Sequence, residues 1–526
     1  VEIGNYAFYE CRDLTSITLP STLATIGSYA FSGCTGLSSI TIPEKVASIG
    51  SSAFRSCKLS EFRGQGNSYY TIDDNRALIV DGGATLLAYA VANLKTSYLI
   101  PEGVTEIGAY TFYNHRSLTS ITIPEGVTSI GTWAFFDCSN LTSINLPSTL
   151  TEINSSAFSG CYALAIVYNN SGLNITEGAI SYERVAYYAK EVVANGQQAQ
   201  GRIEEIGDVN YYFNEKTGEF IALAPSISRD SITQISIVDE AKEINLYAFE
   251  DCVNLTSITL PSTLTSIGNS AFYNCSGLTS ITIPEGVKEI NSSAFSGCYA
   301  LAIVYNNSSL EITKGESEHG WVAYYAKEVV ANGQQAQGRI EESGNVNYYI
   351  NETTGEYIAL APSISRDSIT QISIVNGAKE INRYAFEDCV NLTSITLPST
   401  LTKIGDYAFY NCSALSSITL PSTITTVGSY AFRLCTNLEE ITINGDIETI
   451  GEVAFFDCNS LTKLTLGADV TSIPSNLFST GLSTNLTEIV VLGDLNSTTF
   501  PSGTWTKGGT TVTQFNGAGT YLKSEE

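Results

Sequence analysis

The chain has 526 residues, of which 26 are lysine or arginine and 53 are aspartate or glutamate, so its net charge at pH 7 is −27. A chain this acidic lacks the basic surface that binds nucleic acid or an anionic membrane. Its hydrophobic content of 43% excludes global disorder, and no apolar run is long enough to span a bilayer. Methionine is absent even from position 1, so we expect the sequence to be part of a longer chain.

The cysteines reveal a repeat of 23 residues. Within a cluster each cysteine follows the last by 23 positions, as Cys34 follows Cys11, and His115 stands 23 residues before Cys138 in the same slot. A fixed period of this length is typical of a solenoid. The twelve positions are Cys11, Cys34, Cys57, Cys138, Cys161, Cys252, Cys275, Cys298, Cys389, Cys412, Cys435 and Cys458.

One period, Cys11–Cys34, contains two short extended segments. Ile17 and Leu19 alternate with polar residues, which predicts a strand with one buried face. Pro20 ends this strand, because proline cannot donate to a ladder. The apolar residues of Leu23–Ile26 predict a second short extended piece.

The Ala-Phe segment that follows is predicted to be a short helical turn. In the first period it is Tyr29–Phe31, with the phenylalanine filling the core. One period cannot bury its apolar face alone, so successive coils should stack, with equivalent strands in a parallel sheet on one face. We therefore expect Phe272 to be buried and stacked over Phe295, one coil later.

The period resembles the BspA-like leucine-rich repeat of microbial surface proteins. Its unit, L-x-x-I-x-L-P-x-x-L-x-x-I-x-x-x-A-F-x-x-C, is matched by Leu255–Cys275, which reads LTSITLPSTLTSIGNSAFYNC. The resemblance covers most of the chain. It implies an α/β leucine-rich-repeat solenoid of right-handed coil, located extracellularly or on a cell surface and acting in adhesion, and it brings no catalytic residue.

Three stretches interrupt the period. In residues 58–100, two apolar runs flank Asp81–Gly83, which predicts a β-hairpin. Residues 165–238 and 302–375 are near copies of each other at an offset of 137 positions. A near-identical duplication of this kind indicates a recent expansion, which a stack of coils tolerates.

The two copies are each predicted to contain a helix and a hairpin. In the first copy, apolar residues of Val185–Val193 recur at the spacing of one helical face. Two apolar runs then flank Asn214–Gly218, which predicts the hairpin. We expect both copies to project similar structures.

These features predict one continuous solenoid with eight segments. They are repeats at 1–57 with the N-terminal cap missing, a hairpin insert at 58–100, repeats at 101–164, a helix and hairpin insert at 165–238, repeats at 239–301, the copied insert at 302–375, repeats at 376–492, and a C-terminal cap or linker at 493–526.

The cysteines are predicted to form a structural ladder of buried thiols. Equivalent slots in adjacent coils lie about 5 Å apart, which would permit disulfides by distance. However, a cluster with an odd number of cysteines would leave one cysteine without a disulfide partner, and His115 interrupts the series. Paired C-x-x-C spacing, which a metal ladder would need, is absent from the sequence.

Candidate chemistry is sparse. Only two histidines occur, His115 and His319, which argues against a histidine-rich metal site and a Ser-His-Asp triad. The acidic doublets repeated between the inserts, at 204–205 and 341–342, would point to opposite faces of a strand and so make a poor acid/base pair. We therefore predict no enzyme activity and no catalytic, metal or cofactor-binding residue.

Two features could carry binding. Outward strand positions form stripes of small hydroxyls, such as Ser257 and Thr259, which are either a solvated face or a shallow binding face for protein or glycan. The inserts also concentrate tyrosine, which is favoured at interfaces. The candidate contact residues are Tyr187, Tyr188, Tyr211, Tyr212, Tyr324, Tyr325, Tyr348 and Tyr349.

The sequence thus predicts a protein-binding surface solenoid, a microbial adhesin for host or matrix proteins, with a protein of the same cell surface as an alternative partner. The alternatives left open are a structural scaffold that self-associates and, more remotely, a glycan-binding module. No nucleic acid partner and no membrane span are expected in this segment.

Overall fold

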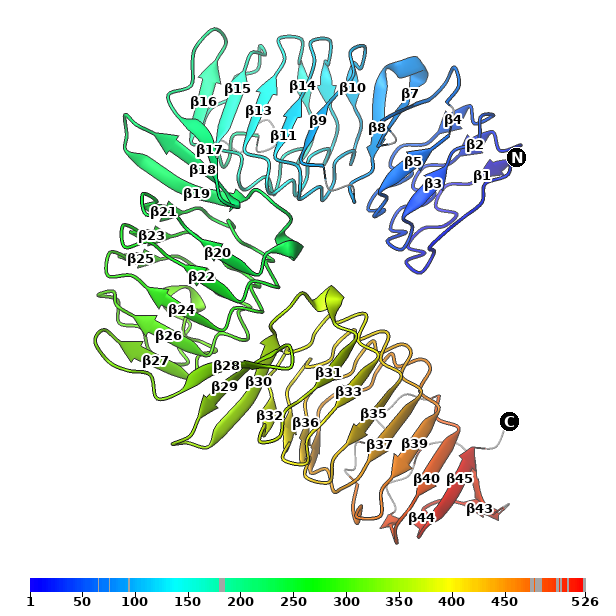
Figure 1. The fold of residues 1–526 in the computed structure, drawn as a ribbon. Helices are drawn as coiled ribbons and strands as arrows, with labels where there is room; N and C mark the ends of the chain where they lie inside the picture. Colours follow the sequence, from blue (N-terminus) through cyan, green and yellow to red (C-terminus); the bar gives the residue numbers. More distant parts are fainter. Residues whose placement is uncertain are drawn as a thin grey trace. The chain divides into compact units, whose positions relative to one another are not determined.

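The computed structural model describes residues 1–64, 66–74, 76–92, 95–178, 185–473, 477, 485–497, 501, 504–508 and 510–523. They form two compact units. Unit 1 comprises Val1–Arg229, Glu240–Ala248 and Ser266–Gly268, and unit 2 comprises Asp230–Asp239, Phe249–Thr265 and Asn269–Glu526. Within each unit, short parallel strands lie side by side as the rungs of stacked coils (Figure 1). Each unit is a β-solenoid.

The first ladder consists mainly of two-residue strands, one per coil. Each places an isoleucine or valine inward, as where Ile26 pairs with Ile3 on one side and Ile49 on the other. In unit 1 its strands are β1 (Glu2–Ile3), β2 (Thr25–Ile26), β4 (Ser48–Ile49), β8 (Thr85–Tyr89), β10 (Glu106–Ile107), β12 (Ser129–Ile130), β14 (Glu152–Ile153), β19 (Glu219–Pro225), β21 (Glu243–Ile244) and β23 (Ser266–Ile267). In unit 2 they are β25 (Glu289–Ile290), β30 (Glu356–Pro362), β32 (Glu380–Ile381), β34 (Lys403–Ile404), β36 (Thr426–Val427) and β38 (Thr449–Ile450).

The second ladder carries the predicted Ser-Ile-Thr alternation. Ile281 and Ile283 are buried while Thr282 between them is exposed. In unit 1 its strands are β3 (Ser39–Thr41), β5 (Glu61–Arg63), β9 (Ser97–Leu99), β11 (Ser120–Thr122), β13 (Ser143–Leu146), β15 (Ile166–Asn169) and β16 (Glu191–Ala194). In unit 2 they are β20 (Gln234–Ser236), β22 (Ser257–Thr259), β24 (Ser280–Ile283), β26 (Ile303–Asn306), β27 (Glu328–Ala331), β31 (Gln371–Ser373), β33 (Ser394–Thr396), β35 (Ser417–Leu420), β37 (Glu440–Ile443), β39 (Lys463–Leu466) and β40 (Glu488–Val491).

In the first coil the strand predicted around Ile17 and Leu19 is not formed. Both side chains are only half-buried, and the second ladder begins one coil later, where β3 pairs with β5. The predicted second extended piece is present as β2.

The Ala-Phe segments form turns and no helix, so the predicted helical turns and the α/β class are wrong. The backbone explains this outcome. Tyr29 and Gly33, which flank Phe31 in the first period, have φ of 55° and 80°, in the left-handed region. A right-handed helix cannot continue through such residues. The described part of the chain is a β protein, because it consists of strands, turns and a few short 3-10 segments. The 3-10 segments are η1 (Asp81–Gly83), η3 (Arg229–Ser231), η4 (His319–Trp321) and η5 (Arg366–Ser368).

Hydrogen bonds between coils replace the helical bonds. The amides of Tyr29, Phe31 and Gly33 donate to carbonyls of the next coil at 2.9–3.2 Å, starting with Ser51. The amides between them donate three residues back, as Ala30 does to Gly27. Every second amide of the turn therefore joins one coil to the next. These bonds offset the cost of about 1–2 kcal/mol for each non-glycine residue held in the left-handed region.

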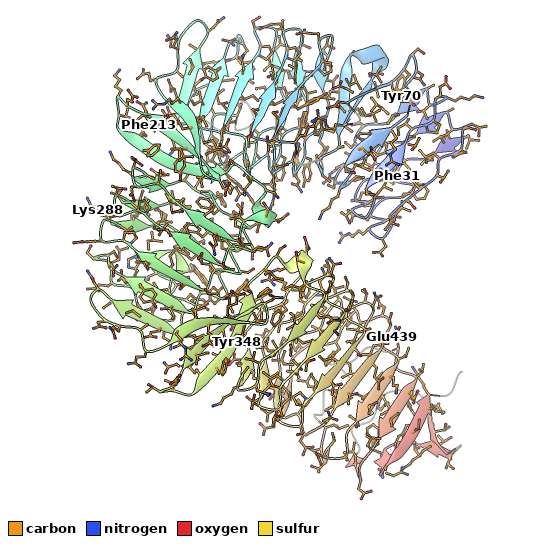
Figure 2. All side chains as sticks on the ribbon, in the orientation of Figure 1. Phe31, Tyr70, Phe213, Lys288, Tyr348 and Glu439 are labelled. Carbon is orange, nitrogen blue, oxygen red and sulfur yellow. The ribbon has the colours of Figure 1, made fainter. Side chains whose placement is uncertain are left out.

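The core of each run of coils contains a stack of three or four phenylalanines with aliphatic residues around it. Phe272 is fully buried, and its ring lies 5.0 Å from that of Phe295, which confirms the predicted stacking. Phe31 and Tyr348, labelled in Figure 2, are likewise buried, whereas Lys288 is exposed. The Ala-Phe pairs thus build the apolar column that successive coils share.

Each interruption of the period carries a three-stranded antiparallel sheet. The sheets are β6 (Thr71–Asp73), β7 (Ala77–Val80) and β8; β17 (Arg202–Ile206), β18 (Val209–Asn214) and β19; and β28 (Arg339–Ser343), β29 (Val346–Asn351) and β30. The third strand of each sheet then pairs in parallel with the next coil, as β30 does with β32. The last strand of each hairpin is therefore also a strand of the first ladder.

The helix predicted over Val185–Val193 is not formed. Residues 185–187 make a turn, and Val192 and Val193 lie in β16, which pairs in parallel with β15. β27 pairs with β26 in the same way in the second copy. β-Branched valines suit a strand, and an edge of the second ladder is available to receive them, so tertiary pairing overrides the helical spacing.

The parallel arrangement ends beyond β40. There β45 (Gly519–Lys523) pairs antiparallel with β40 and with β42 (Trp505–Lys507), and Trp505 and Tyr521 are buried. The remaining strands are β41 (Asn496–Ser497), β43 (Thr510–Val512) and β44 (Phe515–Asn516). Parts of the predicted cap or linker at 493–526 lie outside the described residues.

All twelve cysteines are free thiols, and all except Cys11 are buried. Nine of the thiols donate to a phenylalanine carbonyl of the preceding coil, as Cys57 does to Phe31 at 3.0 Å and Cys298 does to Phe272 at 3.1 Å. Burial is the main cause that raises the pKa of Cys57 to about 12. The cysteine slot therefore links neighbouring coils through a hydrogen bond from sulfur to a backbone carbonyl.

We expect thiol titration to separate Cys11 from the other cysteines. At pH 8 a thiol reagent should react with the folded protein only at Cys11, because the other thiols are buried and inaccessible to it. In denaturant without reductant the count should rise to twelve per chain. A denatured count near zero would show that the slots are paired as disulfides.

Candidate functional site

Four of the eight candidate tyrosines are not surface residues. Tyr211, Tyr212, Tyr348 and Tyr349 are at most 1% exposed, which removes them from the set of contact residues. They lie on β18 and β29, the central strands of the insert sheets, and the two faces of such a strand pack against different parts of the core. Tyr348 belongs to the core of the coils, and Tyr349 packs in a separate cluster.

The other four lie at the surface. Tyr187 is 41% exposed and Tyr324 is 40% exposed, whereas Tyr188 and Tyr325 are half-buried. Within each insert the two rings meet edge to face, with centroids 4.9 Å apart for Tyr324 and Tyr325. The duplicated Ala-Tyr-Tyr segment therefore presents one exposed and one anchored ring in each copy.

In unit 2 this pair begins a longer series that we call the aromatic row. Tyr325 contacts Tyr299 at 5.0 Å between centroids, and Tyr299 stacks on Tyr384 at 3.8 Å. The stack continues through neighbouring coils at 4.6–4.7 Å. In order, the row consists of Trp321, Tyr324, Tyr325, Tyr299, Tyr384, Tyr407 and Tyr430.

The repeat itself creates the row. Tyr384, Tyr407 and Tyr430 precede the Ala-Phe pair in consecutive coils, each with φ of 56–59°, so their side chains leave the turn in the same direction. The insert loops out between Tyr299 and Tyr384 and brings the two together. Asn382 fixes this junction, because its side-chain amide donates to the Tyr299 carbonyl at 2.8 Å.

Two arginines flank the row. The Arg383 guanidinium lies 5.2 Å from the Tyr384 ring centre and 5.6 Å from that of Tyr299, and Arg433 lies 5.7 Å from that of Tyr430. Burial and then the neighbouring phenols raise the pKa of Tyr407. The row therefore offers aromatic edges, phenolic hydroxyls and positive charge, and all of its members are partly exposed.

Unit 1 contains the copied junction without the long row. Tyr162 stacks on Tyr247 at 3.9 Å and meets Tyr188 at 5.1 Å, and Asn245 donates to the Tyr162 carbonyl at 3.1 Å. At the position that corresponds to Tyr407, 137 residues earlier, the sequence has Ser270. The copies thus share the junction and differ in how far the tyrosines continue.

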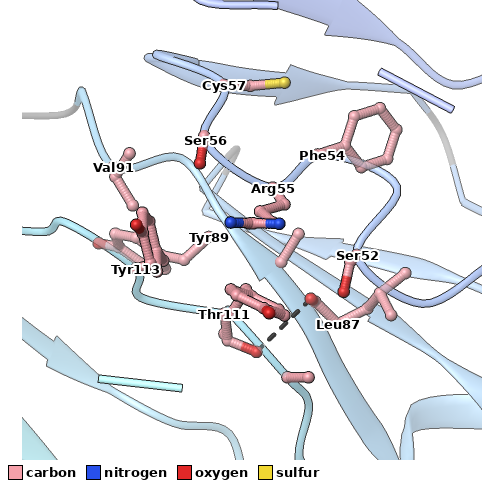
Figure 3. A pocket seen from close by; sticks show the side chains of 13 residues that line it. Ser52, Phe54, Arg55, Ser56, Cys57, Leu87, Tyr89, Val91, Thr111 and Tyr113 are labelled. Carbon is pink, nitrogen blue, oxygen red and sulfur yellow. Dashed lines mark hydrogen bonds between the residues drawn. The ribbon is translucent and has the colours of Figure 1, made fainter. Parts of the chain in front are cut away.

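A second cluster in unit 1 was missed in the sequence. Trp133 and Phe136 stack at 4.6 Å, Tyr113 stacks on Phe136 at 5.2 Å, and Arg55 lies 4.5 Å from the Tyr110 ring centre. Figure 3 shows Arg55 facing Tyr113 in a small pocket. The sequence pattern that indicates this cluster is an aromatic residue on both sides of the core phenylalanine, Phe112 or Phe135, in two successive periods.

The hydroxyl stripes are surface features of the second ladder. Thr259, Thr282 and Thr419 are exposed, and no aromatic side chain interrupts the Ser-Ile-Thr strands that bear them. Among the described residues, no group of three or more His, Cys, Asp or Glu side chains is placed to hold a metal ion. Nor does any helix in the described ranges have the length and apolar character required to cross a membrane.

No curated protein sequence matches the chain. Similar solved structures include a leucine rich cell surface protein from Faecalibacterium prausnitzii, with 21% identity over 89% of this chain and 96% of that chain and a TM-score of 0.30. Others are a leucine-rich repeat protein from Bacteroides ovatus (21% identity, 89% and 88%, TM-score 0.23) and the pneumococcal vaccine antigen PcpA (17% identity, 89% and 80%, TM-score 0.32).

The family comparison covers much more of the sequence than any single period. The model of the BspA type leucine rich repeat region matches in six copies, over residues 1–76, 88–187, 227–317 and 364–487. These ranges contain most strands of the two ladders, the stacked phenylalanines and the cysteine slots described above, and they make up well over half of the chain. The protein therefore belongs to the BspA type leucine-rich repeat family.

Proposed function

We propose that this protein is a microbial surface adhesin that binds a host or matrix protein outside the cell and catalyses no reaction. The observation that carries the proposal is the aromatic row of unit 2. Membership of the BspA type family supports a role in surface protein interaction. The contact surface includes Tyr324 and Tyr325 from the insert and continues along Tyr384, Tyr407 and Tyr430.

The chemistry of the row favours a protein partner. Tyrosine, tryptophan and arginine are enriched at the energetic centres of protein interfaces. The rings of Tyr384, Tyr407 and Tyr430 stack on one another, so they present edges and hydroxyls outward. A sugar would need an open ring face, whereas a polypeptide can meet edges and hydroxyls with its carbonyl and amide groups. The net charge of −27 further favours a partner with a basic surface.

We expect the Tyr407→Ser variant to bind its partner at least tenfold more weakly than the wild type. Tyr407 stands at the middle of the stack, and serine already occupies the same slot at Ser270 and Ser293 with φ of 52–56°, so the coil should fold unchanged. Surface plasmon resonance against immobilised matrix and mucus proteins, with the full chain as analyte, measures the change.

Tyr273→Ser is the matched control, because Tyr273 is 41% exposed in the same unit and stands outside the row. It should bind as the wild type does. Equal affinity in the Tyr407→Ser variant, or no saturable binding to any of these proteins, would contradict the proposal. Light scattering that grows with concentration and is abolished by Tyr407→Ser would assign the row to self-association instead.

A further inference from the structure

The insert of unit 2 encloses a polar hollow that the proposed function does not use. It lies between the end of β27 and the β29–β30 hairpin and has a volume of about 370 Å³. Small-molecule sites in proteins begin at about 300 Å³. Among its lining residues, Lys314, Gln334, Gln335, Gln337 and Thr354 are exposed and Lys327 is half-buried.

The carboxylates in the hollow are already engaged. Glu328 accepts hydrogen bonds from the backbone amides of Gln337 at 2.7 Å and Gly338 at 2.9 Å. Glu356 accepts one from the Thr354 hydroxyl at 2.7 Å. These bonds brace the loop that follows β27 and the hairpin turn, and they leave the two lysines as the groups able to attract an ionic ligand.

Lys327 is free because of a difference between the two copies. Its counterpart in unit 1, Lys190, forms an ion pair with Glu243 at 3.6 Å. In unit 2 the corresponding acid, Glu380, instead pairs with Lys403 of the next coil at 3.1 Å. Within the described part of the chain, Lys327 has no ion pair.

The second lysine differs between the copies outright. Of the residues that line the hollow, only Lys314 is changed in the other insert, where Glu177 stands. Burial first, and then the charges of Glu191, Glu219 and Glu177, raise the pKa of Tyr212, which corresponds to Tyr349 in the wall of the hollow. The charge of Glu177 therefore acts on the equivalent place in unit 1.

The substitution changes the charge around the hollow by two units. In unit 2 the lining has two lysines and two glutamates, so its charges cancel. The corresponding residues of unit 1 are Lys190 with Glu177, Glu191 and Glu219, a charge of −2. In a protein with a net charge of −27, a neutral hollow with two unpaired ammonium groups is a local site for an anion.

We propose that the hollow of unit 2 binds an acidic sugar, a monosaccharide unit that bears a carboxylate. The carboxylate pairs with Lys314 and Lys327, which lie in two separate loop segments. Gln334, Gln335 and Gln337 supply side-chain amides, each able to donate and accept, for the ring hydroxyls. An inorganic anion would pair with the lysines but would leave the glutamine amides without hydrogen-bond partners. An apolar ligand would leave both the lysines and the amides without partners.

The Lys314→Glu variant of the full chain tests the site. The change copies the residue of the other insert, so the fold should be retained. Isothermal titration with N-acetylneuraminic acid and with glucuronic acid should show one site per chain in the wild type for at least one of them, which tells sialic from uronic acid. The variant should bind at least tenfold more weakly, because a charge-assisted contact is replaced by a like charge. Glucose should not bind.

A reciprocal variant tests the charge argument in the other insert. Glu177→Lys together with Ser266→Lys supplies unit 1 with the counterparts of Lys314 and Lys403, and it should raise the number of sites from one to two. Unchanged affinity in Lys314→Glu, equal binding of glucose, or equal binding of inorganic phosphate would overturn the proposal. A single site in the reciprocal variant would do so as well.

Discussion

Phe272→Ala is expected to lower the free energy of unfolding of its coils by about 3–5 kcal/mol. Phe272 is fully buried between Phe249, 5.4 Å away between ring centroids, and Phe295. Its amide donates to the Ala294 carbonyl at 2.7 Å, and its carbonyl accepts the Cys298 thiol. These backbone bonds resist collapse around the missing ring, so a cavity should remain and add to the lost burial.

Native-state hydrogen exchange is the appropriate measurement, because stability in a stack of coils is local. Amides of the coils that contain Phe249, Phe272 and Phe295 should lose protection, and those near Phe432 should be little changed. Phe456→Ala is the control. Phe456 is 50% exposed, so its removal should cost less than about 1 kcal/mol. Similar losses from both substitutions would show that the phenylalanine stack does not determine coil stability.

The repeat and its core were predictable because a solenoid repeats one solution. The spacing of cysteines and Ala-Phe pairs fixes the length of a coil, and stacking then aligns equivalent side chains. The alternation of Ile281 and Thr282 gives the orientation of the second ladder. Once the period is known, the burial of Phe272 and its contact with Phe295 follow without further information.

The form of the turn was not predictable from the same pattern. Tyr-Ala-Phe is compatible with a helical turn, and nothing in its side chains announces a φ of 55° at Tyr29. That conformation is stabilised by hydrogen bonds to the next coil, which a single period does not contain. The segment Val185–Val193 shows the same effect, since its helical spacing gives way to strand pairing with β15.

The candidate contact surface was only half predictable. Tyrosine pairs in an insert can be exposed or buried, and Tyr348 and Tyr324 have opposite fates because one lies on a central strand and the other on a turn. The change from Glu177 to Lys314 is visible in the sequence. Its effect depends on Lys403, which forms an ion pair with Glu380, the acid that would otherwise pair with Lys327. This change of partner becomes apparent only in three dimensions.

Arg366→Met is expected to cost on the order of 3–5 kcal/mol in unit 2, because several charge-assisted hydrogen bonds would be lost together. Arg366 is 5% exposed. Its guanidinium donates to the carbonyls of Ala385 at 3.2 Å and Glu387 at 2.7 Å, and to the Ser276 hydroxyl at 3.2 Å. Methionine retains much of the aliphatic stem and leaves these buried acceptors unpaired. Arg339→Met, which removes an exposed arginine paired with surface glutamates, should cost less than about 1 kcal/mol.

The cost of Arg366→Met should also depend on pH. Burial, and then the charge of Asp388, raise the pKa of Glu387 from 4.5 to about 7, while the Arg366 charge opposes this rise. A carboxyl whose pKa is raised on folding favours the folded state below pH 4.5, and this contribution is lost as the pH rises through 7. Without Arg366, ionised Glu387 destabilises the folded state more, so the variant should lose more stability at pH 8 than at pH 5.

Urea unfolding at both pH values measures the difference, and Arg366→Met with Glu387→Gln should abolish it. A cost equal at both pH values would mean that Arg366 acts through its hydrogen bonds alone, with no effect on the charge of Glu387.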